Sequence, residues 1–170
     1  MQARLTLFVG ERNAGKTTAL QGLLRQSRSQ KKRLCGMLAL ANPEKTVYRL
    51  KDISSNEERL ALSAEPMGEG RRIGRFYLDD NAFHWANRRI LQDLKNAEVV
   101  LFDEIGRLEL SGAGLAPSFR EALEIPGLLV FAAVRLPFVQ DVLAEFSIPR
   151  ENVKIQYVGK DKQEGLKNNE

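Results

Sequence analysis

The chain has 170 residues, of which 43% are hydrophobic and 28% are charged. This length suits one domain with one hydrophobic core, and the composition excludes a disordered or fibrous protein. No apolar stretch approaches the roughly 18 residues of a membrane helix, and we expect neither a secretory signal nor a membrane partner. The single cysteine, Cys35, and the single histidine, His84, exclude a disulfide framework and a Cys/His metal site. We therefore expect a globular cytoplasmic protein.

Basic side chains are concentrated near the N-terminal end of the chain. Residues 1–50 hold ten Lys and Arg against two Asp and Glu, whereas residues 51–150 hold twelve against sixteen. Such an excess is typical of chains that bind nucleic acid or a polyphosphate ligand, and also of a solvated basic face. Because no aromatic residues are interleaved with these basic ones, nothing favours a nucleic-acid partner.

The first elements predicted are a strand, a loop and a helix. Residues 4–9 are β-branched, aromatic and aliphatic, which indicates a buried strand that ends at Gly10. A glycine-containing loop over 10–15 precedes a helix from about 16 to 26, whose leucines share one face.

A β-rich segment follows this helix. An apolar strand is predicted at 34–40, and a turn with Asn, Pro, Glu and Lys at 42–45. Residues 46–50 and 60–64 alternate in the manner of half-buried strands, and one further strand is expected over 73–78. We predict that residues 34–78 form a β-rich insertion on the main sheet.

Strands and helices alternate in the second half of the chain. The predicted elements are a helix after the capping cluster 79–81 that ends near 97, a strand at 99–102, a helix at 115–123, a strand at 128–134, a helix at 137–146 and a strand at 153–158. Continuous apolar strands between amphipathic helices predict an α/β fold, a three-layer α/β/α sandwich around a mainly parallel sheet. We expect one domain over 1–160 and a polar C-terminal tail over 161–170.

The loop after the first strand carries the strongest motif. Residues 10–17, Gly-Glu-Arg-Asn-Ala-Gly-Lys-Thr, match the phosphate-loop pattern G-x-x-x-x-G-K-[ST]. Its glycines let the backbone surround an anion, and the helix N-terminus adds partial positive charge. Lys16 would bridge the β- and γ-phosphates, and Thr17 would place its hydroxyl on Mg²⁺. The expected nucleotide-binding residues of this loop are Gly10, Glu11, Arg12, Asn13, Ala14, Gly15, Lys16, Thr17 and Thr18.

A second motif supplies the acidic groups that such a loop needs. Asp103 and Glu104 directly follow the apolar strand at 99–102, and ligands bind at the carboxyl ends of strands in such sheets. We expect Asp103 to hold Mg²⁺ together with Thr17, and Glu104 to polarise an attacking water. Lys16, Asp103 and Glu104 are thus the expected catalytic residues, and the arrangement favours hydrolysis over transfer to a bound acceptor.

These motifs resemble those of a known family. Residues 103–110, Asp-Glu-Ile-Gly-Arg-Leu-Glu-Leu, together with the phosphate loop and residues 131–135, are similar to the small nucleoside-triphosphatases that include the cancer-related nucleoside-triphosphatases, whose corresponding segment is Asp-Glu-Ile-Gly-Lys-Met-Glu-Leu. The resemblance covers residues 4–158. It implies a phosphate-loop fold of the ATPase (RecA-like) type, in which the strand before Asp103 is not directly beside the strand before the loop. It also implies slow, Mg²⁺-dependent hydrolysis of several nucleoside triphosphates.

Some positions match the family's pattern and others depart from it. Gly106 carries over, and Arg107 retains a positive charge where the family has Lys, so both are expected nucleotide-binding residues. Glu109 is expected to pair with Arg107 and to orient this segment. Residues 37–43 and 159–163 lack the family's Glu-Val-Arg and Asn-Arg segments, and contacts to base and sugar are therefore not predicted.

Four arginines are candidates for stabilising charge on the transferred phosphate. Arg71, Arg72 and Arg75 surround Gly74, and Arg135 ends the strand at 128–134. For each of them a solvated surface position is the favoured interpretation, and an arginine supplied by another subunit would serve as well.

The sequence thus predicts a Mg²⁺-dependent phosphohydrolase that converts ATP, GTP and other nucleoside triphosphates to the diphosphate and phosphate. Two alternatives remain open. One is a nucleotide or nucleoside kinase, and the other is a binding module whose contact with a partner depends on the bound nucleotide and its slow hydrolysis. The preferred base and the presence of a protein partner or a homo-oligomer are also left open.

Overall fold

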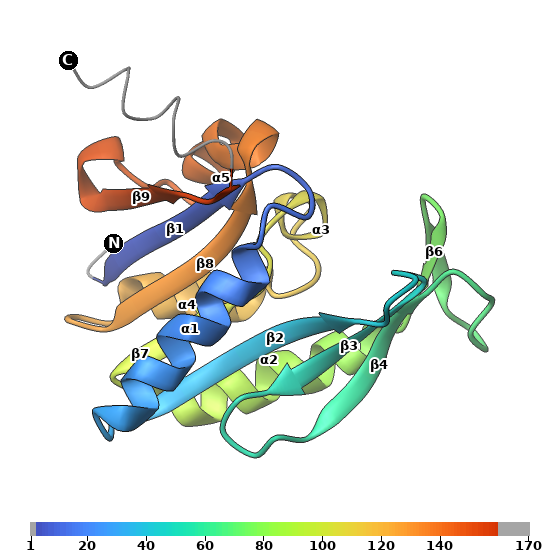
Figure 1. Ribbon diagram of the computed structural model, residues 1–170, viewed down its shortest axis with the longest axis horizontal. Coiled ribbons are helices and arrows are strands. Elements are labelled where there is room, and N and C mark those ends of the chain that lie inside the picture. Colours follow the sequence, from blue (N-terminus) through green and yellow to red (C-terminus); the bar gives the residue numbers. More distant parts are fainter. Residues whose placement is uncertain (1–2, 160–170) are drawn as a thin grey trace.

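A computed structural model of the protein describes residues 3–159. Its strands are β1 (Arg4–Gly10), β2 (Leu34–Ala41), β3 (Val47–Asp52), β4 (Glu58–Ser63), β5 (Arg71–Ile73), β6 (Phe76–Leu78), β7 (Val99–Phe102), β8 (Leu129–Arg135) and β9 (Val153–Tyr157). Over these residues the strands form one sheet in the order β5-β6-β4-β3-β2-β7-β8-β1-β9 (Figure 1). The expected tail at 161–170 lies outside the described residues.

Helices cover both faces of the parallel part of this sheet. They are α1 (Lys16–Ser29), α2 (Asp80–Leu94), the single-turn α3 (Arg107–Leu110), α4 (Ala116–Glu124) and α5 (Val139–Glu145), with 3-10 turns at Leu136–Phe138 and Arg150–Asn152. Figure 1 shows α1 on one face and α2 and α4 on the other. The predicted three-layer α/β/α architecture is therefore confirmed. No helix in the described part of the chain has both the length and the apolar character to cross a membrane.

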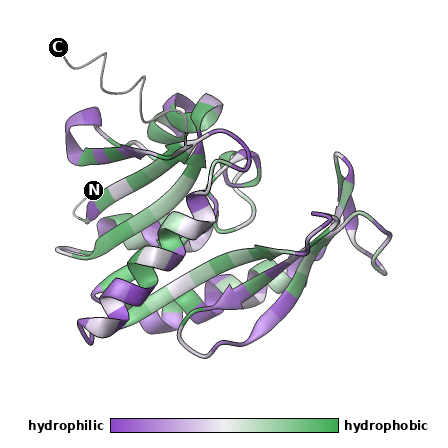
Figure 2. Ribbon diagram, in the orientation of Figure 1, coloured by the Kyte–Doolittle hydropathy of each residue, from purple (hydrophilic) through white to green (hydrophobic). Residues whose placement is uncertain are grey.

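The side chains of β7 show why this strand is apolar throughout. Val99 and Leu101 pack with the leucines of α1 on one face. Val100 and Phe102 belong to the larger core on the other face, which is filled by α2, α4 and α5. Because both faces are covered, every position of the strand is buried. Figure 2 accordingly shows the central strands as mostly hydrophobic.

Strand order sets the positions of the two motifs. Strands β2, β7, β8, β1 and β9 pair in parallel, so that their carboxyl ends lie along one edge. Strand β8 separates β1 from β7, and Arg135 at its end is in register with Gly10 of β1. This confirms the expectation that the strand before Asp103 is not directly beside the strand before the phosphate loop.

The β-rich insertion continues the same sheet. Strands β3, β4, β6 and β5 add to β2 in antiparallel fashion, and we call these four strands the antiparallel extension. The strand β2 pairs in parallel with β7 and thus belongs to the parallel part. The single strand expected over 73–78 is wrong, because the chain reverses at Gly74, which has a positive φ of 59°, and forms the hairpin β5–β6 instead.

Strand β2 approaches β7 so closely at Gly36 that only glycine fits there. Its φ is +129°, and a Cβ atom would overlap the backbone of Leu101.

We expect Gly36→Ala to lower the free energy of unfolding by about 3 kcal/mol or more, since the backbone strain and the overpacking add to one another. Gly112→Ala is the matched control, because Gly112 also has a positive φ, of +81°, but nothing lies within 4 Å of the added methyl. Its expected cost is about 1 kcal/mol. Urea unfolding measures both, and equal losses would show that the close approach is unimportant.

Candidate functional site

The loop between β1 and α1 turns sharply at the edge of the sheet and lines a cavity with residues 12–15. Asn13 and Gly15 have positive φ values of 63° and 98°, a left-handed conformation that turns the chain sharply before the helix. The Lys16 ammonium group, which is buried, donates hydrogen bonds to the carbonyl oxygens of Gly10 at 3.2 Å and Glu11 at 2.8 Å. Burial lowers the pKa of Lys16, and the nearby Glu104 carboxylate opposes this shift.

Asp103 lies in direct contact with this loop. Its side chain is only 4% exposed, and Oδ2 accepts hydrogen bonds from the Thr17 hydroxyl at 2.8 Å and from the Ala39 N–H at 3.2 Å. Burial raises the pKa of Asp103 to about 6, although both hydrogen bonds favour the ionised form. The two residues expected to hold the metal are therefore neighbours in space.

The oxygen atoms of Thr17 and Asp103 fit Mg²⁺. This ion is held in nucleotide sites by one or two protein oxygen ligands together with substrate phosphates and water. Among residues 3–159 no cluster of three or more His, Cys, Asp or Glu side chains could enclose a metal. A metal at this position would consequently depend on the phosphates for its remaining ligands.

Glu104 lies between two cations. Its side chain is 32% exposed; Oε1 accepts a hydrogen bond from Arg135 Nε at 3.1 Å, and Oε2 is 4.0 Å from Lys16 Nζ. The guanidinium group of Arg135 also lies over the ring of Phe138, with 5.1 Å from Cζ to the ring centroid. Together these contacts hold a partly accessible carboxylate at the edge of the phosphate loop.

The structure separates the four candidate arginines. Arg135 contacts Glu104 in the site, and Arg75 lines the same cavity. Arg71 pairs instead with Asp80 at 3.0 Å, and Arg72 donates to the carbonyl of Gly74 at 3.1 Å. Neither Arg71 nor Arg72 lines the cavity.

Glu109 has a different role from the one expected. Instead of pairing with Arg107, its buried carboxylate, 4% exposed, accepts hydrogen bonds from the N–H groups of Gly106 at 2.9 Å and Leu115 at 3.0 Å. It therefore connects the start of α3 with the start of α4. The sequence signal was the spacing Gly106 to Glu109, which places a Glu at the third position of α3, where its carboxylate accepts from the N-cap N–H as in one half of a capping box. Gly114 is required next to it, because a Cβ there would overlap Glu109 Oε1.

A cavity of about 800 Å³ contains these groups. Its polar part is lined by residues 12–18 of the loop region and by Asp103, Glu104 and Arg135. Gly106 and Arg107 also line it. Gly10 and Glu11 do not, and their carbonyl oxygens hold Lys16 instead. The remainder of the cavity extends under the antiparallel extension and is mostly apolar.

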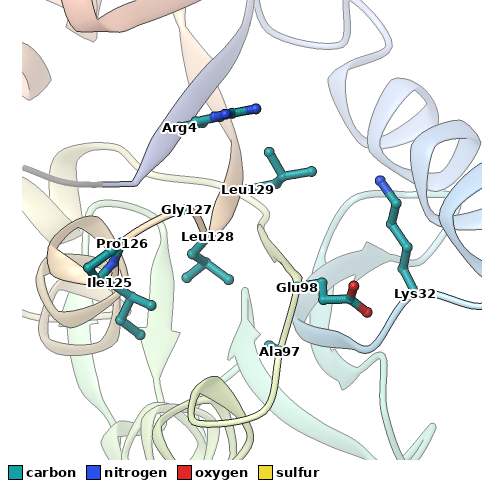
Figure 3. A pocket seen from close by; sticks show the side chains of 9 residues that line it. All are labelled: Arg4, Lys32, Ala97, Glu98, Ile125, Pro126, Gly127, Leu128 and Leu129. Atoms are coloured by element: carbon teal, nitrogen blue, oxygen red, sulfur yellow. The ribbon is translucent and has the colours of Figure 1, made fainter.

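A second cavity, of about 410 Å³, lies at the opposite edge of the sheet (Figure 3). Arg4 and Leu129, at the amino ends of β1 and β8, line it together with Lys32 and Glu98. Ligands of open α/β sheets bind at the carboxyl ends of strands, and the loop, Asp103 and Glu104 are all at that other edge. The larger cavity is therefore the candidate functional site.

A phosphate loop after the first parallel strand, facing an acidic residue two strands away, defines the class of phosphate-loop nucleoside triphosphatases. The model of the NTPase family matches residues 6–169, and the chain belongs to this family. This confirms the resemblance seen in residues 103–110. A search of curated proteins finds no significant match.

Two solved structures are similar in fold. The solution structure of a human cancer-related nucleoside triphosphatase superposes with a TM-score of 0.73 at 21% identity, covering 97% of this chain and 94% of the other. The crystal structure of THEP1 from the hyperthermophile Aquifex aeolicus superposes with a TM-score of 0.71 at 17% identity, covering 95% and 93%. Both structures support a common fold across nearly the whole chain.

The buried carboxyl of Glu109 leads to a pH dependence of stability. Burial raises the pKa of Glu109 from 4.5 to about 7. Between these values the native state binds more protons than the unfolded state, so the free energy of unfolding falls as the pH rises. We expect the native protein to lose stability relative to Glu109→Gln from about pH 4.5 to pH 7, measured by urea unfolding across this range. Glu121→Gln, on the exposed face of α4, controls for the loss of one negative charge. If the free energy of unfolding changes with pH in the same way for the native protein and for Glu109→Gln, the raised pKa of Glu109 is contradicted.

Proposed function

We propose that the protein is a Mg²⁺-dependent nucleoside-triphosphate phosphohydrolase, which converts ATP, GTP and other nucleoside triphosphates to the diphosphate and phosphate. Membership of the NTPase family supports nucleoside-triphosphatase activity. The proposal of Mg²⁺-dependent hydrolysis rests on the hydrogen bond from Thr17 to Asp103. Next to it, the Glu104 carboxylate lies between Lys16 and Arg135. Slow turnover and loose base selectivity are part of the proposal and come from the family resemblance. Because its one cysteine is a buried free thiol, we also propose a cytoplasmic location.

Binding of the triphosphate is proposed to occur at the phosphate loop. Backbone N–H groups of residues 12–18 surround the β-phosphate, and the N-terminus of α1 favours its negative charge. Lys16 exchanges its hydrogen bonds to the carbonyl oxygens of the loop for the β- and γ-phosphate oxygens. Thr17 and Asp103 would hold Mg²⁺, which supplies positive charge to the β- and γ-phosphates when it is bound. Arg107, near the same end of the cavity, adds a further cation.

Hydrolysis is proposed to depend on Glu104. Its carboxylate accepts a hydrogen bond from a water molecule and orients the water oxygen toward the γ-phosphorus. The oxygen–phosphorus bond forms as the bond between the γ-phosphorus and the bridging oxygen breaks; the Glu104 carboxylate takes up the proton that the water loses, and the diphosphate leaves with the bridging oxygen. Arg135 holds Glu104 in place through the hydrogen bond at 3.1 Å. The protein's contribution is therefore positioning and electrostatic stabilisation.

Substitution of Lys16 tests the binding step. We expect Lys16→Ala to abolish detectable binding of a fluorescent nucleotide, because the buried ammonium group is the principal cation of the loop. Lys95→Ala, at the C-terminal end of α2, is a control remote from the loop. Binding retained by Lys16→Ala would contradict the assignment of the site.

Substitution of Glu104 separates hydrolysis from binding. We expect Glu104→Gln to bind nucleotide like the native protein and to release phosphate about 10² to 10⁴ times more slowly, since the amide does not accept the proton from water. Glu151→Gln, which changes an exposed carboxylate near β9, should leave both quantities unchanged. An active Glu104→Gln protein would remove Glu104 from the mechanism.

The reaction itself is tested with a panel of nucleotides. We expect phosphate and the matching diphosphate as products from ATP, GTP, CTP and UTP, with rates that differ by less than about tenfold, that is by about 1.4 kcal/mol in activation free energy. Chelation by EDTA should stop the reaction, and excess Mg²⁺ should restore it. Hydrolysis that is unaffected by EDTA would refute the metal dependence, and product appearing only when a nucleoside acceptor is added would indicate a kinase.

A further inference from the structure

The main cavity continues beyond the phosphate site into an apolar compartment. Six apolar side chains line this compartment: Tyr48, Leu62, Ile73, Phe76, Phe83 and Leu108. They come from β3, β4, β5, β6, α2 and α3, so that the antiparallel extension forms most of the wall. The rings of Tyr48 and Phe76 meet edge to face, with centroids 5.5 Å apart. Apolar walls with aromatic rings are typical of sites for small organic ligands.

The order of the strands places this compartment on the side of the γ-phosphate. From the phosphate loop on β1 the sheet runs through β8 with Arg135, then β7 with Asp103, then β2, and only then to the extension. In the proposed function the γ-phosphate lies on the side of Asp103 and Glu104, that is, on the side of the loop that faces the extension. By strand order, the apolar compartment therefore lies beyond the γ-phosphate end of the triphosphate.

Cationic side chains line the boundary between the two parts of the cavity. Lys45, in the turn after β2, donates a hydrogen bond to Asn13 and so links that turn to the phosphate loop. Arg75 donates to the carbonyl of Lys45 at 3.1 Å and lies over the ring of Phe76, 4.7 Å from its centroid. Within residues 3–159 neither Lys45, Arg75 nor Arg107 forms an ion pair with a carboxylate. Their positive charge is thus available to an anion in the cavity.

We propose that the apolar compartment is a second ligand site, occupied at the same time as the nucleotide site, for a small organic anion with a flat apolar body. The apolar body packs against Tyr48 and Phe76, and its carboxylate or phosphate group meets Arg75 and Lys45. The proposal rests on the proposed function for the direction of the triphosphate. The charge complementarity and the aromatic walls are independent of that direction.

Naphthalene-2-carboxylate and the neutral naphthalene-2-carboxamide are the matched probes. Binding to the full chain is measured by ligand-detected NMR, with and without a non-hydrolysable ATP analogue and Mg²⁺. We expect both probes to bind, the carboxylate about fivefold more tightly because it gains a partly exposed ion pair. Both should remain bound when the ATP analogue is present.

Two pairs of variants locate the bound probe. Arg75→Gln should remove the preference for the carboxylate, whereas Arg72→Gln, on the same hairpin but outside the cavity, should keep it. Ala41→Trp, at the cavity end of β2 and in register with Tyr48, should fill the compartment and weaken binding of both probes at least about tenfold, a loss of about 1.4 kcal/mol. Ala144→Trp on α5 is its control. Binding of the ATP analogue shows that each variant is folded.

Three outcomes would overturn the proposal. The carboxylate and carboxamide binding equally would refute the role of the cations, and unchanged binding in Ala41→Trp would place the probes elsewhere. Displacement of both probes by the ATP analogue would assign the apolar compartment to the nucleoside. If the analogue does not bind to the native protein, the proposed function fails, while the probe and variant comparisons without nucleotide still decide whether the second site exists.

Discussion

The site depends on one contact across the sheet, the hydrogen bond between the Thr17 hydroxyl and the Asp103 carboxylate. These residues are 86 positions apart in sequence. Thr17 lies in the first turn of α1, after β1, and Asp103 directly follows β7; β1 and β7 do not pair. The two residues meet because β1 and β7 run parallel on either side of β8, which brings their carboxyl ends to one edge. Burial of Asp103 makes its ionised form costly, and the loop and β2 supply the hydrogen bonds that offset this cost.

Three carboxylates within seven residues occupy different environments. Asp103 and Glu109 are buried, and burial raises the pKa of each. Asp103 faces the phosphate loop, whereas Glu109 accepts hydrogen bonds only from backbone groups that begin α3 and α4. Glu104 is partly exposed between Lys16 and Arg135. Three chemically similar side chains therefore have different roles. Asp103 is proposed to bind the metal and Glu104 to orient the water, whereas Glu109 holds the segment that carries them.

The antiparallel extension distinguishes this cavity from a simple phosphate site. It continues the sheet past β2 and forms most of the apolar wall of the cavity that also contains the phosphate loop. The hydrogen bond between Lys45 and Asn13 joins this extension to the phosphate loop.

The local sequence by itself determined the phosphate loop, the acidic pair Asp103–Glu104 and the alternation of strands and helices, because each depends on neighbouring residues whose spacing is visible in the chain. It also determined the family, through the motif at 103–110 and its order after the loop. Only the tertiary structure decided the partners of Glu109, the reversal at Gly74 and the division of the arginines between site and surface. These depend on which strands become neighbours, and contacts between distant strands follow from packing of the whole sheet rather than from local spacing.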